Sequence, residues 1–173
     1  STAGQYKNGP FTGIVGFEYN NNVRCYNGNA GGTNATCGTT HTLEADDWAL
    51  GIAAAWDFGI VRVAGLYERI DYDTPQGGLK RDMWGAYFSG PVGPGKWYLG
   101  YSWAKDGKGP STQRVNGISG GDDTGAYHLS ISYNQPISKR TSWYVAYSRL
   151  DNDDNASYNF NINPYRNAVN STT

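Results

Sequence analysis

Two side chains that could perform covalent chemistry stand close together in the sequence: His128 and, two residues later, Ser130. A histidine can act as the base that activates a serine for acyl transfer or hydrolysis, provided that the two groups come within hydrogen-bond reach. Residues two apart in a β-strand share a face but lie about 6.6 Å apart along it, so a direct bond needs favourable rotamers. No acidic residue is placed to orient His128, and catalysis is therefore kept only as an alternative interpretation.

The other candidate ligands do not complete a reactive site. His41 is the only histidine near Cys25 and Cys37, and no second cysteine pair supplies the four ligands of a structural zinc site. The acids that follow residue 150 could attract calcium, but acids in an asparagine-rich stretch are more often solvated. We therefore predict no catalytic residues, no metal and no cofactor, and hence a protein that is not an enzyme.

The two cysteines, Cys25 and Cys37, flank a run of small and polar residues without a core-forming pattern, YNGNAGGTNAT. We predict a disulfide that closes this loop. The loop-entropy model gives such a bond roughly 3 kcal/mol of stabilisation, and it implies an oxidising compartment such as the periplasm or the cell surface. Two free thiols are the alternative.

Composition excludes several classes of protein. The 173 residues carry a net charge of −1, which argues against nucleic acid as a partner. Mean hydropathy is −0.62, and no apolar run of about 18 residues exists to form a membrane-spanning helix. The 24 glycines disfavour long helices, and the chain is rich in aromatic residues, with 14 tyrosines and 6 tryptophans.

Alternation of large and small side chains is the strongest pattern in the chain. In residues 48–58 the even positions are Trp, Leu, Ile, Ala, Trp and Phe, and the odd positions are Ala, Gly, Ala, Ala and Asp. A period of two places alternate side chains on opposite faces of a strand. The large face is aromatic at both ends, and the other face is too small and polar for a core. This combination fits a strand whose large face meets lipid.

We predict seven strands, at residues 11–19, 47–58, 60–70, 81–89, 96–104, 124–133 and 142–150. The connections between them are alternately long and short, as in outer-membrane barrels, whose extracellular loops are long and periplasmic turns short. The two patterns together predict an all-β fold, a transmembrane antiparallel β-barrel. A soluble β-sandwich binding module is the alternative. The aromatic residues expected at the membrane interfaces are Trp48, Trp56, Phe58, Trp84, Trp97, Trp103, Tyr133 and Trp143.

Charged residues within the predicted strands fall mainly on the small face. A charge in mid-strand would cost about 2–4 kcal/mol on a lipid-facing side and little toward water, so these residues should line the lumen. They are Glu18, Asp57, Arg62, Glu68 and Arg81. Arg62 and Arg81 could attract anions, and Glu68 could pair with one of them. Arg69 breaks the pattern of the large face, and we expect it at a loop base above the membrane.

Residues 134–154, with Ser138-Lys139-Arg140-Thr141 among them, resemble a turn and strand near the C-terminal end of the trimeric general porins of Gram-negative bacteria, in particular the β-proteobacterial type. Residues 159–164 and the turn Asn8-Gly9-Pro10 are similar to further porin segments. The resemblance implies a homotrimer in the outer membrane, in contact with the lipid bilayer and lipopolysaccharide. It also implies a water-filled channel for passive diffusion of small hydrophilic solutes and ions.

The chain departs from that family in length and in two motifs. Members close their barrel with sixteen strands in about twice this length. The acidic motif of their constriction loop and their terminal strand ending in an aromatic residue are absent here. We therefore expect residues 1–173 to form one β-barrel domain that is the C-terminal half of a longer porin. The alternative is a small barrel with an eighth strand from residues 1–9 or 156–169, which could be a lipid hydrolase using His128 and Ser130.

Overall fold

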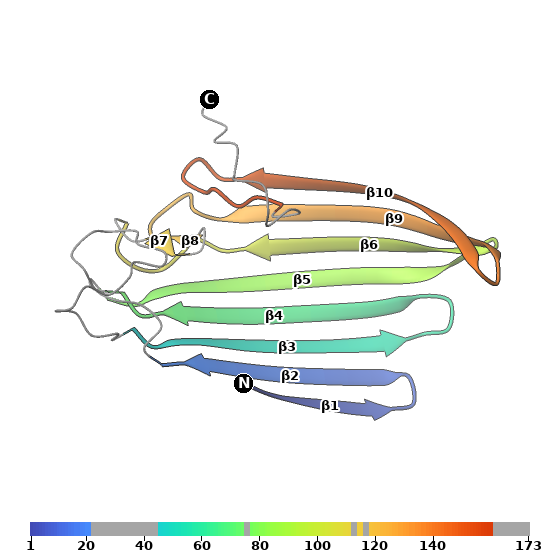
Figure 1. The fold of residues 1–173 in the computed structure, drawn as a ribbon, viewed down its shortest axis with the longest axis horizontal. Helices are drawn as coiled ribbons and strands as arrows, with labels where there is room; N and C mark the ends of the chain where they lie inside the picture. Colours follow the sequence, from blue (N-terminus) through green and yellow to red (C-terminus); the bar gives the residue numbers. More distant parts are fainter. Residues whose placement is uncertain (22–44, 75–76, 112–113, 116–117, 161–173) are drawn as a thin grey trace.

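The main feature of the computed structural model is one antiparallel sheet of eight strands (Figure 1). The structure describes residues 1–21, 45–74, 77–111, 114–115 and 118–160. The strands of the sheet are β1 Thr2–Asn8, β2 Phe11–Asn20, β3 Asp47–Asp57, β4 Arg62–Tyr72, β5 Leu79–Val92, β6 Gly95–Ala104, β9 Ala126–Ser138 and β10 Thr141–Asn152. They are paired in chain order, and a separate small hairpin, β7 Arg114–Val115 with β8 Ile118–Ser119, is inserted between β6 and β9. The predicted all-β, antiparallel fold is confirmed.

No helix in the described part of the chain has the length and apolar character of a membrane span.

The register divides the sheet into two faces of different character. Residues directly opposite one another in neighbouring strands share a face. Ile52, Tyr67 and Trp84 pair in turn across β3, β4 and β5, and they belong to what we call the aromatic face. Gly51 and Glu68 pair on the other side, the polar face, where Gly, Ala, Ser and isolated charges are common. The alternation predicted from the sequence is therefore confirmed.

Short turns close one end of the sheet, and longer connections lie at the other (Figure 1). The turns of the β1–β2, β5–β6 and β9–β10 hairpins are Gly9-Pro10, Gly93-Pro94 and Lys139-Arg140. Gly9 and Gly93 have φ angles of 54° and 53°, a left-handed conformation that glycine adopts without steric strain. We call the two ends the turn end and the loop end, and their contrast agrees with the predicted loop lengths.

The sequence prediction was wrong about the number of strands in the sheet. Residues 2–8 form β1, which pairs with β2 from Thr2 opposite Phe17 to Asn8 opposite Phe11. Only the small-barrel alternative had placed an eighth strand in this segment. Tyr6 is the one large apolar side chain of β1, so its own pattern is too weak to identify it, and pairing with β2 determines its conformation.

Several strand boundaries also differ from the prediction. Residues 134–138, predicted as part of a turn because of their Asn, Pro and Ser content, extend β9. A register shift between Thr141 and Ser142 accommodates Pro136, which has no N–H to give to a regular ladder. The strand predicted at 60–70 runs from Arg62 to Tyr72, and the strand predicted at 81–89 is longer and runs from Leu79 to Val92. Phe58, predicted as the last residue of a strand, lies in the turn after β3.

The buried apolar cluster of the described residues lies where loops return onto the polar face at the loop end. Leu79 is fully buried and packs with Val115 of β7 and Ile118 of β8, and Tyr72 and Tyr158 pack against these three. Tyr72 and Leu79 are opposite one another on the polar face. The β7–β8 hairpin and the segment around Tyr158 therefore cover this end of that face.

Glycine at residue 95 allows the β5–β6 hairpin to approach β9 closely. A Cβ there would contact the backbone oxygen of Asn134 and would lie 2.6 Å from the hydroxyl of Tyr133. A Cβ at Gly51 would meet nothing within 4 Å. We expect Gly95→Ala to lower the free energy of unfolding by about 1–3 kcal/mol and Gly51→Ala to change it by less than about 1 kcal/mol, in urea unfolding in detergent. Equal effects of the two substitutions would contradict this packing.

Candidate functional site

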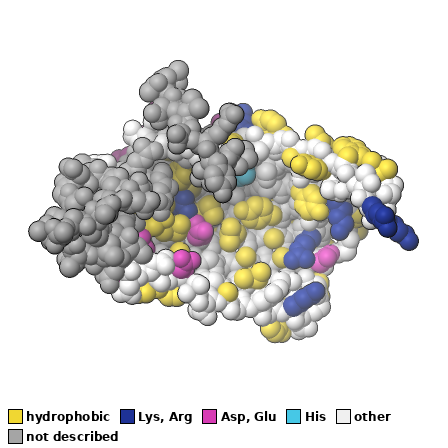
Figure 2. All heavy atoms as spheres, in the orientation of Figure 1, with side chains coloured by type: hydrophobic (Ala, Val, Ile, Leu, Met, Phe, Trp, Pro, Cys, Tyr) yellow, Lys and Arg dark blue, Asp and Glu magenta, His cyan; other side chains and the backbone are white. Residues whose placement is uncertain are grey.

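The five charged residues predicted to share the small face do lie on one face of the sheet, the polar face. Glu18 on β2 and Arg81 on β5 lie in the same row across the sheet, connected by the paired residues Ala49 and Ile70. This row is near the loop end. Glu68 lies one pair further along the sheet, and Asp57 and Arg62 are opposite one another at the turn end. Figure 2 shows charges of both signs distributed among uncharged side chains on one face of the molecule. Their role in lining a lumen remains a prediction.

Arg81 and Glu68 form a close ion pair. Nη2 of Arg81 lies 2.6 Å from Oε1 of Glu68, and 11% of the Arg81 side chain is exposed. The ring of Tyr158 covers the guanidinium, with its centroid 5.8 Å from Cζ. The prediction that Glu68 pairs with either Arg62 or Arg81 is therefore confirmed, and the partner is Arg81. The charge of Arg81 is offset and covered, and Arg62 is the one of the two with an exposed side chain.

The covering segment follows β10 and returns over the polar face. Asn152 holds it with two hydrogen bonds: its Nδ2 donates to the carbonyl oxygen of Tyr158 at 2.9 Å, and its Oδ1 accepts from the Tyr158 N–H at 3.1 Å. The ring of Phe160 meets the ring of His128 edge to face, with centroids 5.4 Å apart. A cavity of about 240 Å³ lies between this segment and the sheet. This covering segment was not predicted from the sequence, where its signal was a Tyr and a Phe in a polar stretch.

Two further cations lie on the polar face near the turn end. Lys7 is the penultimate residue of β1, and Lys96 is the second residue of β6. Lys7 was not identified from the sequence because β1 was not predicted as a strand, and Lys96 was assigned no role. Together with Arg62, these residues give three cations at this end of the face. Asp57, opposite Arg62, is an acid at the same end, and its Oδ1 accepts a hydrogen bond of 2.8 Å from the Gly59 N–H.

The aromatic face carries one belt of rings toward each end. In the turn-end belt, Phe11 and Trp56 have ring centroids 6.2 Å apart, and the centroids of Tyr133 and Trp143 are 5.5 Å apart. In the loop-end belt, Tyr67 and Trp84 approach to 4.5 Å. Of the predicted interface residues, Trp48, Trp84 and Trp103 lie toward the loop end, and Trp56, Trp97, Tyr133 and Trp143 lie toward the turn end.

The spacing of the belts matches a bilayer. Trp48 and Trp56, on the same strand, are separated by eight residues and hence by about 27 Å along it, which a tilt of about 40° reduces to about 21 Å along the membrane normal. The apolar band of an outer-membrane barrel is about 25 Å tall, and its strands are tilted.

Charged side chains lie beyond the loop-end belt on the aromatic face. Asp82 accepts a hydrogen bond of 2.8 Å from the hydroxyl of Tyr67. The same carboxylate lies 3.8 Å from Nε of Arg69 and 3.7 Å from Nζ of Lys108. Nζ of Lys105 lies 5.3 Å from the ring centroid of Trp103. Arg69 is thus part of a polar network toward the loop end of β4, three residues before the strand ends at Tyr72, and its position above the membrane remains a prediction.

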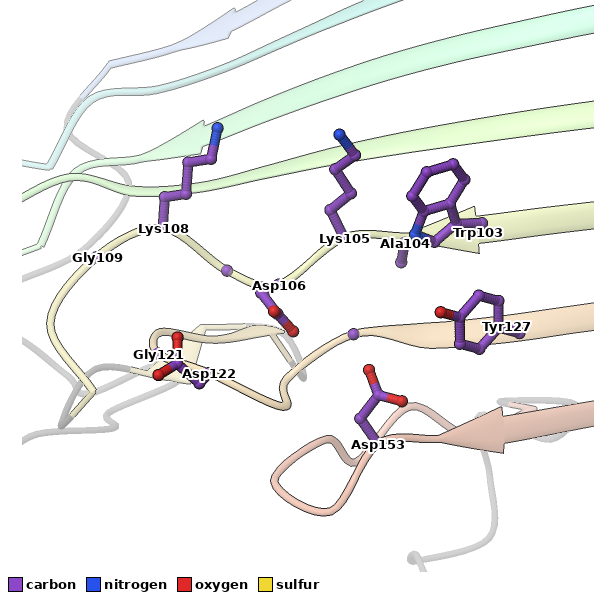
Figure 3. A pocket seen from close by; sticks show the side chains of 12 residues that line it. Trp103, Ala104, Lys105, Asp106, Lys108, Gly109, Gly121, Asp122, Tyr127 and Asp153 are labelled. Carbon is purple, nitrogen blue, oxygen red and sulfur yellow. The ribbon is translucent and has the colours of Figure 1, made fainter.

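A pocket of about 600 Å³ opens beside this network. Trp103 and Tyr127, which are opposite one another on β6 and β9, belong to its lining. The side chains of Lys105 and Lys108 extend to the same side of the loop, whereas the carboxylates of Asp106 and Asp153 point toward each other (Figure 3). Aromatic rings next to amines and carboxylates suit a sugar or phosphate group. Among the described residues, no group of three or more His, Cys, Asp or Glu could hold a metal ion.

His128 contacts a different serine from the one expected. Its Nε2 lies 2.7 Å from Oγ of Ser148, on β10. The hydroxyl of Ser130 instead faces the carbonyl oxygen of Gly100 at 3.5 Å. In the described part of the chain no carboxylate is hydrogen-bonded to His128. The structure therefore does not assemble the base and nucleophile that the hydrolase alternative requires of His128 and Ser130.

Two predictions lie outside the described residues. The loop with Cys25 and Cys37, and with it the predicted disulfide, falls in residues 22–44. His41 falls in the same range. Of the porin-like segment at 159–164, only residues 159 and 160 are described.

The Glu68–Arg81 pair should be coupled energetically because Arg81 is covered. Glu68→Gln leaves the guanidinium without its carboxylate, whereas Glu68→Gln with Arg81→Met removes both charges. We expect a coupling energy of about 1–3 kcal/mol in a double-mutant cycle measured by urea unfolding. The more exposed pair of Lys80 and Asp71, with N–O 3.0 Å, should give less than about 1 kcal/mol. Coupling no larger than in this control would contradict the covered pair.

Comparison with known proteins agrees with this geometry. A model of the Gram-negative porin family matches residues 1–155, which is most of the chain. A search of the curated proteins gives no match. The location that this family implies is the outer membrane, and its activity is that of a channel rather than an enzyme. The paired strands of the sheet and its two different faces agree with this match. The chain therefore belongs to the Gram-negative porin family.

Proposed function

We propose that the polar face lines a water-filled channel through which small hydrophilic solutes and ions diffuse passively. The observation that carries this proposal is the division of one sheet into an aromatic face with two belts and a face of small, polar and charged residues. Only the first face suits lipid, and only the second suits water. Glu18, Asp57, Arg62, Glu68 and Arg81 are then part of the channel wall.

The sheet is part of a larger barrel. β1 and β10 are its two edge strands. An edge within lipid would leave N–H and C=O groups without partners, each at a cost of several kcal/mol, so a spanning sheet must close. In the porin, further strands pair with β1 and β10, and residues 1–173 make up the C-terminal half of the polypeptide. The family match to most of the chain supports the assignment to a porin barrel.

Two segments narrow the channel at its loop end. The β7–β8 hairpin packs through Val115 and Ile118 onto Leu79 of the polar face. The segment after β10 lies over Arg81 and His128 through Tyr158 and Phe160. Both occupy space on the water-facing side, so they limit the size of solutes that pass.

The porin is a homotrimer, and the aromatic face supplies a suitable contact. Gly13, Ala54, Gly65 and Ala86 are opposite one another in turn across β2 to β5. Small residues in a row allow two membrane-embedded surfaces to approach closely. The large side chains of Phe11 and Trp56 lie beside this row.

Lipopolysaccharide contacts the barrel at the loop-end pocket of the aromatic face. Trp103 and Tyr127 lie in the belt where acyl chains meet headgroups. Lys105 and Lys108 above them can bind phosphate, and the neighbouring carboxylates can bind sugar hydroxyls. His128 and Ser148, by contrast, lie on the water-facing side and serve to join β9 and β10.

The complete protein should form channels when reconstituted. We expect stepwise conductance increments in planar bilayers and release of small sugars from liposomes, because the proposed channel wall is polar. Ser130→Ala should leave both unchanged. Absence of conductance steps from folded protein would overturn the proposed function, and lipid deacylation lost in Ser130→Ala would support the hydrolase alternative instead.

The protein isolated from the outer membrane should contain a disulfide between Cys25 and Cys37, since the compartment is oxidising. Without reduction, mass spectrometry should find one cross-linked peptide carrying both cysteines, and alkylation should label neither. Cys25→Ser should make Cys37 reactive. Alkylation of both cysteines in the unreduced wild-type protein would contradict the disulfide.

A further inference from the structure

The turn end of the polar face is rich in exposed, unpaired cations. Lys7, Arg62 and Lys96 are exposed and lie within two residues of the turn end of their strands. No carboxylate of the described residues lies within 4.0 Å of their side-chain nitrogens in an ion pair. Asp57, opposite Arg62, is the acid of this zone. We call these four residues the basic zone; its net charge is +2, from three cations and one acid.

The loop half of the same face has the opposite balance. Glu18 is exposed, and its Oε1 accepts a hydrogen bond of 2.8 Å from Nδ2 of Asn20 rather than an ion pair. Glu68 and Arg81 offset one another, and the charge of Arg81 is covered. Among the described residues of this half, the exposed charge is therefore that of Glu18, which is negative, and we call Glu18 with the Glu68–Arg81 pair the acidic zone. In Figure 2 most of the basic side chains on the visible face lie toward the turn end, with one acidic group among them.

The two zones are far enough apart to act separately. Glu18 is in register through Ala49 with Ile70, which lies eight residues from Arg62 on β4, or about 27 Å along the strand. The Debye length is about 10 Å at 0.1 M salt and about 3 Å at 1 M. At moderate salt each zone therefore controls the ions near itself, and at high salt neither extends its field across the lumen.

We propose that this charge separation along the channel axis makes the open porin rectify ionic current, with Lys7, Arg62, Lys96 and Glu18 as the residues that determine it. The proposal rests on the proposed channel function. The acidic zone enriches cations at the loop mouth, and the basic zone enriches anions at the turn mouth.

The direction of rectification follows from which ions each zone admits. When the loop side is positive, cations enter past the acidic zone and anions enter past the basic zone, so both accumulate in the lumen and the current is high. When the loop side is negative, each ion must enter past the zone that repels it, the lumen is depleted, and the current is low. The larger current therefore flows with the loop side positive.

The test is a current–voltage measurement on the complete porin in planar bilayers at about 0.05 M and about 1 M KCl. A hexahistidine insert between Lys139 and Arg140, in all variants, marks the turn side, since Ni²⁺ added to one chamber affects the current only when that side faces it. We expect a ratio of currents at opposite voltages of about 1.5-fold or more at low salt, falling to about 1 at high salt.

Charge-removing variants connect the ratio to its residues. The triple substitution Lys7→Gln, Arg62→Gln and Lys96→Gln should bring the low-salt ratio close to 1, and Glu18→Gln should reduce it. A matched control, Arg69→Gln with Lys80→Gln and Arg149→Gln, removes three cations from the aromatic face and should leave the ratio unchanged. A variant that has the same conductance as the wild type at 1 M salt is taken to have folded correctly.

Two results would overturn the inference while leaving the channel function intact: symmetrical currents in the wild type at low salt, or a ratio that the triple variant retains. The opposite direction of rectification would also overturn it. Folded protein that forms no channel would instead defeat the proposed function itself.

Discussion

The structure depends on one constraint, which is that backbone N–H and C=O groups within lipid must bond to one another. Every strand in the interior of the sheet meets this requirement because it is hydrogen-bonded to a neighbour on each side. β2, for example, pairs with β1 and β3, and β9 pairs with β6 and β10. The constraint explains why residues as unremarkable as those of β1 are strands, since the backbone rather than the side chains forms the pairing. It also requires partners for the two edges.

Pairing in register then divides the side chains between two solvents. Because a strand has a period of two, a slip of one residue would exchange the lipid-facing and water-facing sets of that strand. Trp56 would then face water, and Arg62 would face lipid. The pairs Trp56–Val63 and Asp57–Arg62 show that register and alternation agree. The charges of the polar face and the rings of the belts are thus two consequences of the same register.

This dependence explains what could be predicted from the sequence. Alternation in residues 48–58 specifies which side chains share a face, so the predicted face of Glu18, Asp57, Arg62, Glu68 and Arg81 was correct. Patterns within one strand do not describe contacts between distant segments. That Tyr158 covers Arg81, or that His128 bonds to Ser148 rather than Ser130, depends on loop conformation and on the pairing of β9 with β10. β1 and the end of β9 were missed because polar and Pro-containing segments can pair without an apolar pattern.

The two ends of the sheet differ in chemistry because they differ in construction. At the turn end the strands are joined by tight turns that leave no chain to fold inward, so Lys7, Arg62 and Lys96 remain exposed on the polar face. At the loop end the long connections return onto the polar face, bury Leu79 and cover Arg81, so that a cation there is removed from the water-facing surface. Loop length therefore affects which charges of the polar face are exposed. Among the described residues of that face, one cation is covered at the loop end and three are exposed at the turn end, and the proposed rectification depends on this difference.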